Sequence, residues 1–412
     1  MLQAVLFSSD ATIDVIKETK DSIKISVEGY SETDKNGEFL KKMKKMVIAD
    51  LKVAGVFFVS DIEFPSSFEA DIALLQYREN KIDYLLKFKT LKDNAKYSLM
   101  ADLYDIKANK KVLTKKYSVS SEERYPFLSH KLIAQIAEML NIEDLSWMEK
   151  FVIFAVNTSP KQSKIMIGDY SLTFTQSIIN SGLNLFPKWR DSSQREFFYT
   201  NLNSTPVLYK ADLYSGKKEK ITQSDGMLVC SDVSEDGNRL LLTMAPEDQP
   251  DIYMYNLQTK AQNKITSEKS IDVNGNFLDD EESIVFVSDR LGKPNIFSKK
   301  LTGNSVEQMV YKGKNNNFCT SYKNYIAYVS RDTNSEFDDN AFNIYLISTK
   351  TDYIRQLTTT GKNLFPRFSP NGDTLLYIKN YKNESALGII RLGYNKSFLF
   401  PLKTGKLQAV DW

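Results

Sequence analysis

The sequence predicts a two-domain protein: an amino-terminal α/β domain, in which helices pack a small sheet, and a carboxy-terminal six-bladed β-propeller. Helical and strand periodicities both occur up to about residue 146. After Trp147 the helical periodicity disappears, and strand-like hexapeptides recur about every 44 residues. We therefore expect domains at residues 1–146 and 147–412.

The amino-terminal half alternates between the two periodicities. Apolar residues at steps of three and four predict a helix that ends at Gly55, because glycine readily adopts the conformation that ends a helix. Runs that alternate apolar and polar residues predict antiparallel strands with one buried face. The expected elements are strand pieces 5–7, 13–16 and 23–27, a helix 36–54, a strand 56–59, a helix 66–76, strands 82–88, 97–103 and 112–119, and a helix 122–140.

The carboxy-terminal half is a repeat of four strands. Six apolar hexapeptides carry it, at 151–156, 196–201, 240–245, 284–289, 326–331 and 375–380. A second strand and a short third piece follow each hexapeptide, and five hexapeptides are preceded by a further strand. Repeats of this length with regular turn signals are typical of propeller blades.

The ends of this region predict how the ring closes. The 266 residues from Trp147 to Trp412 divide into six units of about 44. The first unit lacks an innermost strand, and Trp412 falls 44 residues after Phe368, where the next innermost strand is due. We expect strand 407–412 to complete the first blade and to leave no long free edge.

Composition excludes several classes of protein. The 54 Lys and Arg balance 52 Asp and Glu, so the net charge is only +2 and no nucleic-acid partner is indicated. No apolar run approaches the roughly 18 residues of a membrane-spanning helix. The single histidine, His130, lies in a predicted helix without a catalytic partner. Cys230 and Cys319 are expected to be free buried thiols. The run before Ser9 is too short for a signal peptide, so we expect a mature or trimmed chain.

Several motifs resemble one family. The segment 288–297, SDRLGKPNIF, resembles the SDRxGxPxIY signature of TolB-type propeller repeats, and 368–372, FSPNG, resembles their FSPDG turn. In the amino-terminal half, 47–57 resembles the VAADLxxSGxF segment of these proteins, and 82–86, 101–105 and 129–131 resemble later landmarks in the same order. The chain is identified as a member of the TolB family of the Tol-Pal system.

The resemblance implies a periplasmic, non-enzymatic adaptor. In the family, the propeller mouth binds the lipoprotein Pal, and the amino-terminal segment binds the carboxy-terminal domain of TolA. These contacts support outer-membrane integrity and constriction at cell division, and colicins exploit the same mouth. The resemblance therefore implies no cofactor, no transmembrane segment and no nucleic acid, and we expect a monomer.

Candidate binding residues lie at the mouth and at the amino terminus. The loops before the innermost strands should lie at one end of the channel, where aromatic and amide side chains together suit a protein interface. For Phe186 and Phe365 a blade-packing role is equally open. The amino-terminal segment either pairs with a partner as an edge strand or docks onto its own domain. The predicted mouth residues are Asn184, Leu185, Phe186, Asp225, Gly226, Met227, Asp272, Asn315, Asn316, Phe318, Asn363, Leu364 and Phe365, and those of the amino-terminal segment are Val5, Phe7, Asp10 and Ile13.

Three alternatives stay open from the sequence. Asp225 and Asp272 are oxygen donors of the kind that a channel calcium ion prefers. A propeller hydrolase or lyase, or the propeller of a serine peptidase, would place an active site in the channel. The lack of a channel histidine and of a GxSxG elbow argues against the enzymes. A propeller that binds a small ligand is the third alternative. The mouth also departs from the family, because other members often carry a histidine there.

Overall fold

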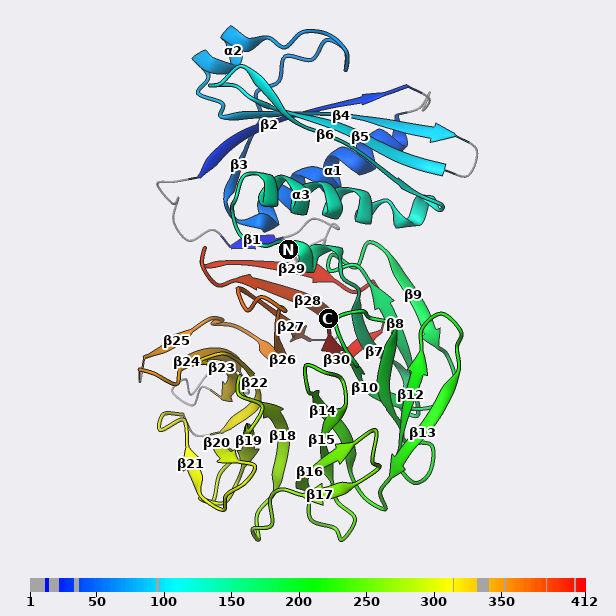
Figure 1. Cartoon of the computed structure of the whole chain (residues 1–412), viewed down its shortest axis with the longest axis vertical. Helices are drawn as coiled ribbons and strands as arrows, with labels where there is room; N and C mark the ends of the chain where they lie inside the picture. The colour runs from blue at the N-terminus through cyan, green and yellow to red at the C-terminus, as the bar shows by residue number, and fades with distance from the viewer. Residues whose placement is uncertain are drawn as a thin grey trace, which may run out of the picture. The chain divides into compact units, whose positions relative to one another are not determined.

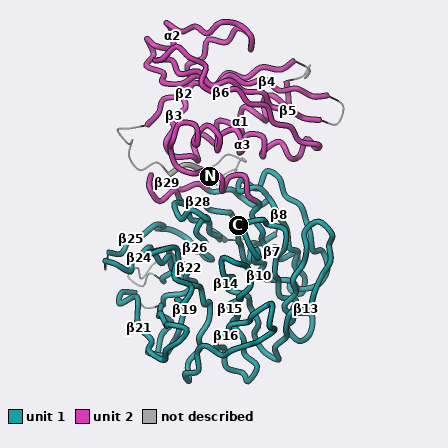
Figure 2. Tube along the Cα trace, viewed as in Figure 1, with its two compact units in different colours: residues 1–10, 151–390, 399–412 teal, residues 11–150, 391–398 magenta. Residues whose placement is uncertain are grey.

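The structure, a computed structural model, describes residues 12–14, 22–32, 37–93, 96–313, 315–331, 341–351, 353–382, 384–403 and 405–412. The chain forms two compact units (Figure 2). One unit runs to Lys150 and also includes Arg391–Phe398, and the other contains Phe151–Ile390 and Leu399–Trp412. None of the helices in the described ranges combines the length and the apolar run that crossing a bilayer requires.

The amino-terminal unit is built on a five-stranded sheet in the order β3-β2-β4-β5-β6. Strand β2 is parallel to β3 and β4, and β4, β5 and β6 are antiparallel. Helices α1 and α3 lie along one face of this sheet (Figure 1). The elements are β1 (Thr12–Asp14), β2 (Ile23–Ser31), α1 (Glu38–Ala54), β3 (Phe57–Ser60), α2 (Leu74–Glu79), β4 (Tyr84–Asp93), β5 (Lys96–Asp105), β6 (Lys110–Val119) and α3 (Pro126–Met139).

The buried face of α1 holds this unit together. Met43, Val47 and Leu51 are completely buried, as the helical spacing predicts. On the same helix Asp50 is also buried, and its carboxylate lies 2.8 Å from Nδ1 of His130 in α3. His130 is therefore a buried, hydrogen-bonded residue between two helices, because a buried polar group needs a partner.

Helix α2 is shorter than predicted. The prediction of a helix over 66–76 is wrong, since α2 begins only at Leu74. The ammonium group of the buried Lys87 lies 2.8 Å from the carbonyl oxygen of Ser67 and 2.9 Å from that of Ala70. These carbonyls solvate a buried charge, and they are therefore held in a turn rather than in a helix.

Residues 391–398 belong to the same unit through specific contacts. Arg391 is fully buried, forms an ion pair with Glu143 and lies 5.5 Å from the centre of the Trp147 ring. Lys396 donates to the carbonyl oxygen of Gly55 at 2.7 Å. The ring of Tyr394 packs so closely on Gly55 that an added Cβ would lie 2.6 Å from it, so this helix end requires glycine.

The second unit is a six-bladed propeller, as predicted. Each blade has four antiparallel strands, and its innermost strand lies nearest the centre of the ring (Figure 1). Five blades are consecutive in sequence: β10 (Asn184–Trp189), β11 (Glu196–Asn201), β12 (Val207–Asp212) and β13 (Lys218–Gln223); β14 (Leu228–Val233), β15 (Arg239–Met244), β16 (Asp251–Asn256) and β17 (Gln262–Lys264); β18 (Asp272–Phe277), β19 (Ser283–Ser288), β20 (Asn295–Lys300) and β21 (Val306–Gln308); β22 (Asn316–Tyr322), β23 (Tyr325–Arg331), β24 (Phe342–Ser348) and β25 (Ile354–Gln356); and β26 (Lys362–Phe368), β27 (Thr374–Tyr381), β28 (Glu384–Arg391) and β29 (Lys396–Pro401).

The sixth blade joins the two ends of the propeller. It consists of β30 (Lys406–Asp411) beside β7 (Val152–Ser159), β8 (Gln162–Gly168) and β9 (Thr175–Ile179). Val410 pairs with Phe154, and both side chains are buried. The prediction that the carboxy-terminal strand completes the first blade is confirmed. The ring is thus closed by hydrogen bonds between segments more than 200 residues apart in sequence.

Candidate functional site

Each innermost strand of the propeller contains a β-bulge. Each innermost strand has one residue more than the neighbouring strand where the pairing register shifts, at the same level in five blades and one residue pair earlier in β30 (Lys406–Asp411). A bulge bends the strand locally and re-aims the side chains at that point. The register shifts fall between Leu185 and Lys188, Cys230 and Asp232, Val273 and Asn276, Asn317 and Thr320, Leu364 and Arg367, and Leu407 and Ala409.

Bulky residues occupy a strained conformation at these bulges. Phe186, Phe318 and Phe365 have φ angles of 53°, 48° and 54°, and Asn274 at the equivalent place has 55°. Asparagine tolerates the left-handed region, whereas an aromatic residue there costs roughly 1–2 kcal/mol. Strain of this kind persists where the fold imposes it, and it gathers at ligand sites. The repetition of the feature in three blades marks this level of the channel as a candidate site.

The bulge residues surround a cavity of about 330 Å³ on the channel axis, which we call the channel cavity. All six innermost strands contribute to its wall. The rings of Phe318 and Phe365 lie in it with their centres 4.4 Å apart. The other lining residues are mainly apolar and include Phe186, Met227, Val229, Val273 and Val410. An apolar concave wall with a few polar groups is the usual form of a binding site.

The structure corrects where several predicted mouth residues lie. Four of these residues do not lie in loops. They lie at the first or second position of the innermost strands: Asn184, Asp272, Asn316 and Asn363. Their side chains are at most 1 % exposed. Asn363, for example, donates to the carbonyl oxygens of Phe342 and Thr360 at 2.9 and 3.0 Å. The three asparagines form hydrogen bonds with neighbouring strands, and Asp272 pairs with Arg290. The role of these four residues in partner binding stays a prediction that their burial disfavours.

In the blade formed by β14–β17, the three predicted mouth residues lie too early in the sequence. The innermost strand β14 begins at Leu228, after Asp225, Gly226 and Met227. Cys230 therefore stands where Phe186 stands in the preceding blade. The 44-residue spacing from Trp189 to Val233 carried this information. Of the three, Met227 is 43 % exposed and also lines the channel cavity.

The remaining predicted residues are distributed around the mouth. Leu185 is half-buried and packs against a hydrophobic cluster within its blade region. Leu364 is also half-buried, and Asn315 accepts a hydrogen bond from the side chain of Asn317. Val5, Phe7 and Asp10 lie outside the described residues. Ile13 lies in β1, which is next to β29 in the strand order.

A second level of the channel was missed by the sequence analysis. A polar side chain stands within the last three residues of each innermost strand, and we call these six residues the polar ring. Their spacing is 44 residues in every step but one, which is the signal that would have revealed them. The polar ring consists of Lys188, Asp232, Asn276, Thr320, Arg367 and Asp411.

The polar ring is internally paired. Lys188 lies 3.0 Å from the carboxylate of Asp411 and 3.3 Å from that of Asp232. Arg367 donates to Oδ1 of Asn276 at 3.1 Å and to the carbonyl oxygen of Ser231 at 3.3 Å, which carries its side chain across the channel to the opposite blades. Arg367 is also the member of the polar ring that lines the channel cavity.

The acidic members of the polar ring also bind backbone. Asp411 accepts from the backbone N–H of Trp189 at 2.9 Å, and Asp232 accepts from that of Phe277 at 2.9 Å. Each carboxylate thus joins its own blade to the next one. Charge-assisted hydrogen bonds of this kind are the stronger ones in proteins.

The channel offers little acid–base chemistry. Cys230, in the cavity wall, and Cys319 are free and buried, and burial raises the pKa of both thiols, that of Cys319 to about 12. Neither thiol is therefore an activated nucleophile. No group of three or more His, Cys, Asp or Glu side chains that suits a metal ion occurs in the described part of the chain. Arg290 lies 3.0 Å from the carboxylate of Asp272, so a calcium ion at Asp272 would compete with this guanidinium.

Comparisons with known proteins agree for both units. Residues 147–412 match the family model described as the TolB beta propeller domain, and residues 11–112 match the TolB amino-terminal domain. The chain is 44 % identical over 409 residues to the Tol-Pal system protein TolB of Wolinella succinogenes, covering 99 % of this chain and 97 % of that protein. It is 40 % identical to the same protein of Helicobacter hepaticus over 414 residues, covering all of this chain and 98 % of that protein. The crystal structure of TolB from Acinetobacter baumannii superposes with a TM-score of 0.80 at 22 % identity, covering 97 % of this chain and 99 % of that one.

Proposed function

Because the chain belongs to the TolB family of the Tol-Pal system, a family of periplasmic proteins, we propose that it is a non-enzymatic adaptor of the periplasm. In this proposal the channel cavity binds the lipoprotein Pal. The amino-terminal segment binds the carboxy-terminal domain of TolA. Joining the two supports outer-membrane integrity and constriction at division, and colicins would compete with Pal for the channel cavity.

The observation that supports Pal binding is the strained aromatic wall of the channel cavity. Three phenylalanines are held in a costly backbone conformation with their rings half-exposed. Packing within a blade does not require an aromatic side chain here, because Cys230, Asn274 and Ala409 stand at the same position, two residues before the polar ring, in the other innermost strands. Aromatic side chains in a concave, largely apolar site are the usual anchors of protein interfaces.

The lining residues also support an adaptor rather than an enzyme. Arg367 and Cys230 are the ionisable groups in the described wall of the channel cavity. Arg367 is held by Asn276 and Ser231, and burial keeps Cys230 protonated. General acid–base catalysis needs a group whose pKa lies near the working pH, and neither residue supplies one.

Calorimetric titration of the full chain with the soluble domain of Pal from the same organism tests the proposal. We expect saturable binding, weakened about tenfold or more by Phe365→Ala or Phe186→Ala, since truncation of an interface anchor typically costs 2 kcal/mol or more. Tyr214→Ala is the matched control, because this aromatic residue is 73 % exposed in the turn between β12 and β13, at the other end of its blade.

The TolA contact needs its own measurement. Deletion of residues 1–10, which contain Val5, Phe7 and Asp10, should abolish binding of the TolA carboxy-terminal domain and preserve binding of Pal. Binding of TolA by the shortened chain would contradict this part of the proposal. Wild-type protein that fails to bind Pal at about 100 μM, a concentration at which even weak transient complexes form, would contradict the adaptor proposal itself.

A further inference from the structure

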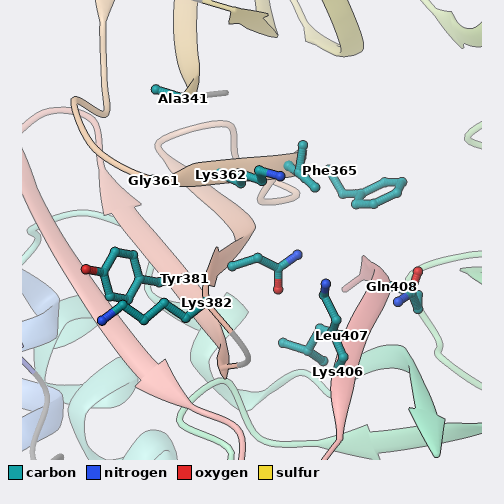
Figure 3. A pocket seen from close by; sticks show the side chains of 11 residues that line it. Ala341, Gly361, Lys362, Phe365, Tyr381, Lys382, Lys406, Leu407 and Gln408 are labelled. Carbon is teal, nitrogen blue, oxygen red and sulfur yellow. The ribbon is translucent and has the colours of Figure 1, made fainter. Parts of the chain in front are cut away.

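A second recess adjoins the channel cavity at the end of the blades where the innermost strands begin. It has a volume of about 480 Å³ and lies between the start of β26, the end of β27 and the start of β30 (Figure 3). Lys362 on β26 and Lys406 on β30 stand on two sides of it (Figure 3). Asn380 and Gln408 also line it. We call this feature the lysine recess.

The polar groups of the lysine recess are mainly hydrogen-bond donors. The described residues that line it include three lysines, Lys362, Lys382 and Lys406, and no acidic side chain. Within the described ranges neither Lys362 nor Lys406 forms an ion pair, and both are exposed. The side-chain oxygen of Asn380 accepts from Ser385 at 2.5 Å, so its amide nitrogen is the group left to donate. Such a set of donors suits an anionic ligand.

The lysines of the recess differ in their charge partners from Lys188, the lysine of the polar ring. Lys188 in the polar ring has two carboxylates within 3.3 Å, and its charge is neutralised inside the fold. The charges of Lys362 and Lys406 are not neutralised in this way by the described residues. A recess that gathers uncompensated positive charge raises the local concentration of anionic groups and steers their approach.

The lysine recess is continuous with the channel cavity through one residue. Phe365 lines both, with Lys362 three residues before it on β26. A protein that packs an apolar side chain against the ring of Phe365 in the channel cavity therefore brings its adjoining residues to the lysine recess. The lysine recess therefore lies on the face proposed above to bind a partner, and it presents positively charged side chains to that partner.

We propose that the lysine recess binds carboxylate side chains of an acidic segment in the same protein that occupies the channel cavity. This inference rests on the proposed function, since it assumes that the cavity receives a protein partner. It adds the chemistry of that partner: an apolar anchor followed by glutamate or aspartate. Exposed ion pairs contribute little each, so we expect each lysine to change affinity about two- to fivefold and to act mainly on the association rate.

The test uses the full chain and the soluble domain of Pal, titrated at low and at high salt. Lys362→Gln and Lys406→Gln should each weaken binding about two- to fivefold, and the double variant about tenfold, with a smaller salt dependence than wild type. Lys217→Gln is the matched control, because Lys217 is exposed in the turn that precedes β13 at the opposite end of its blade. Unchanged melting temperatures show that the variants remain folded.

The outcomes separate this inference from the proposed function. If Pal binds wild type and the double variant with equal affinity and equal salt dependence, the lysine recess inference is overturned and the adaptor proposal stands. If Pal does not bind wild type, a peptide with one phenylalanine followed by glutamates replaces it as the probe. Peptide binding that the double variant loses then supports the inference. Absence of peptide binding, or equal binding by anionic lipid vesicles in place of the peptide, overturns it.

Discussion

Two levels of the same six strands differ in how their side chains are satisfied. At the bulges, three phenylalanines sit at positive φ with half-exposed rings around a cavity. Two residues further along, the polar ring is charged, largely buried and paired across the blades. The aromatic residues at the bulges are strained and partly exposed. The polar-ring residues named here already have hydrogen-bond and ion-pair partners within the propeller. The comparison teaches that in this propeller strained, half-buried aromatic residues and paired polar residues lie only two positions apart on the same innermost strands.

Of the changes proposed here, removal of the closing strand β30 should reduce the stability of the propeller most. Deletion of residues 407–412 removes three buried side chains, Leu407, Ala409 and Val410, together with Asp411 of the polar ring. Each buried aliphatic group contributes about 1–3 kcal/mol, so we expect a loss of about 5 kcal/mol or more and an open propeller. Thermal denaturation followed by circular dichroism measures it. A deletion variant that melts like wild type would show that closure does not depend on β30.

The second prediction isolates the polar ring with a single substitution. Asp411→Ala leaves Lys188 and Arg367 without their shared carboxylate and the N–H of Trp189 without its acceptor. Breaking a buried ion pair typically costs about 3–5 kcal/mol, and we expect about 3 kcal/mol in chemical denaturation.

Glu219→Ala is the matched control for Asp411→Ala. Glu219 also pairs with two lysines, at 3.1 and 3.4 Å, but its side chain is 50 % exposed. Its loss should cost less than about 1 kcal/mol, because water screens exposed pairs. Equal losses for the two variants would contradict the view that burial gives the polar ring its importance.

The third prediction concerns the strain at the bulges. Phe365→Asn and Phe365→Ala delete the same ring, but only asparagine tolerates the φ of 54°. The asparagine variant should therefore be more stable than the alanine variant by about 1 kcal/mol, while both lose Pal binding about tenfold or more. Denaturation and calorimetry of the two variants measure these quantities. Equal stability would show that the positive φ carries no cost at this position.

The difference between the two levels also explains what the sequence could and could not predict. The six blades, the closing strand and the turns at Gly237 and Gly372 follow from periodicity and turn chemistry, because each is a local pattern repeated at fixed spacing. The bulges do not follow, since an extra residue shifts the alternation of apolar residues by one position, and a strand of six or seven residues is too short to show such a shift. For this reason Phe186, Phe318 and Phe365 were predicted at the mouth but assigned to loops.

Other misplacements have similar physical causes. Asn184 and Asn363 are residue types that suit an interface, yet their side chains form hydrogen bonds with Ser181 and Asn201 and with Phe342, inside the propeller. A helix was predicted over 66–76 from the local sequence, and the contacts of the buried ammonium of Lys87 override that local preference. Arg391 joins the amino-terminal unit through Glu143 and Trp147, a pairing over 240 residues that no periodicity encodes.

The smallest expected effect per residue tests the burial of the two thiols that lie beside these levels. Burial raises the pKa of Cys230 and Cys319 in the folded protein above the usual value, so the unfolded chain releases protons at a lower pH than the folded chain does. Stability from this source is complete below the unfolded pKa of about 8.5 and falls as the pH rises above it. Between pH 7 and pH 9 we expect each thiol to account for a loss of about 0.8 kcal/mol. Urea denaturation at both pH values, in wild type and in Cys230→Ala with Cys319→Ala, measures the difference. If the double variant loses as much stability as wild type, the thiols are not the source, and the channel wall at Cys230 is more open to water than its 3 % exposure indicates.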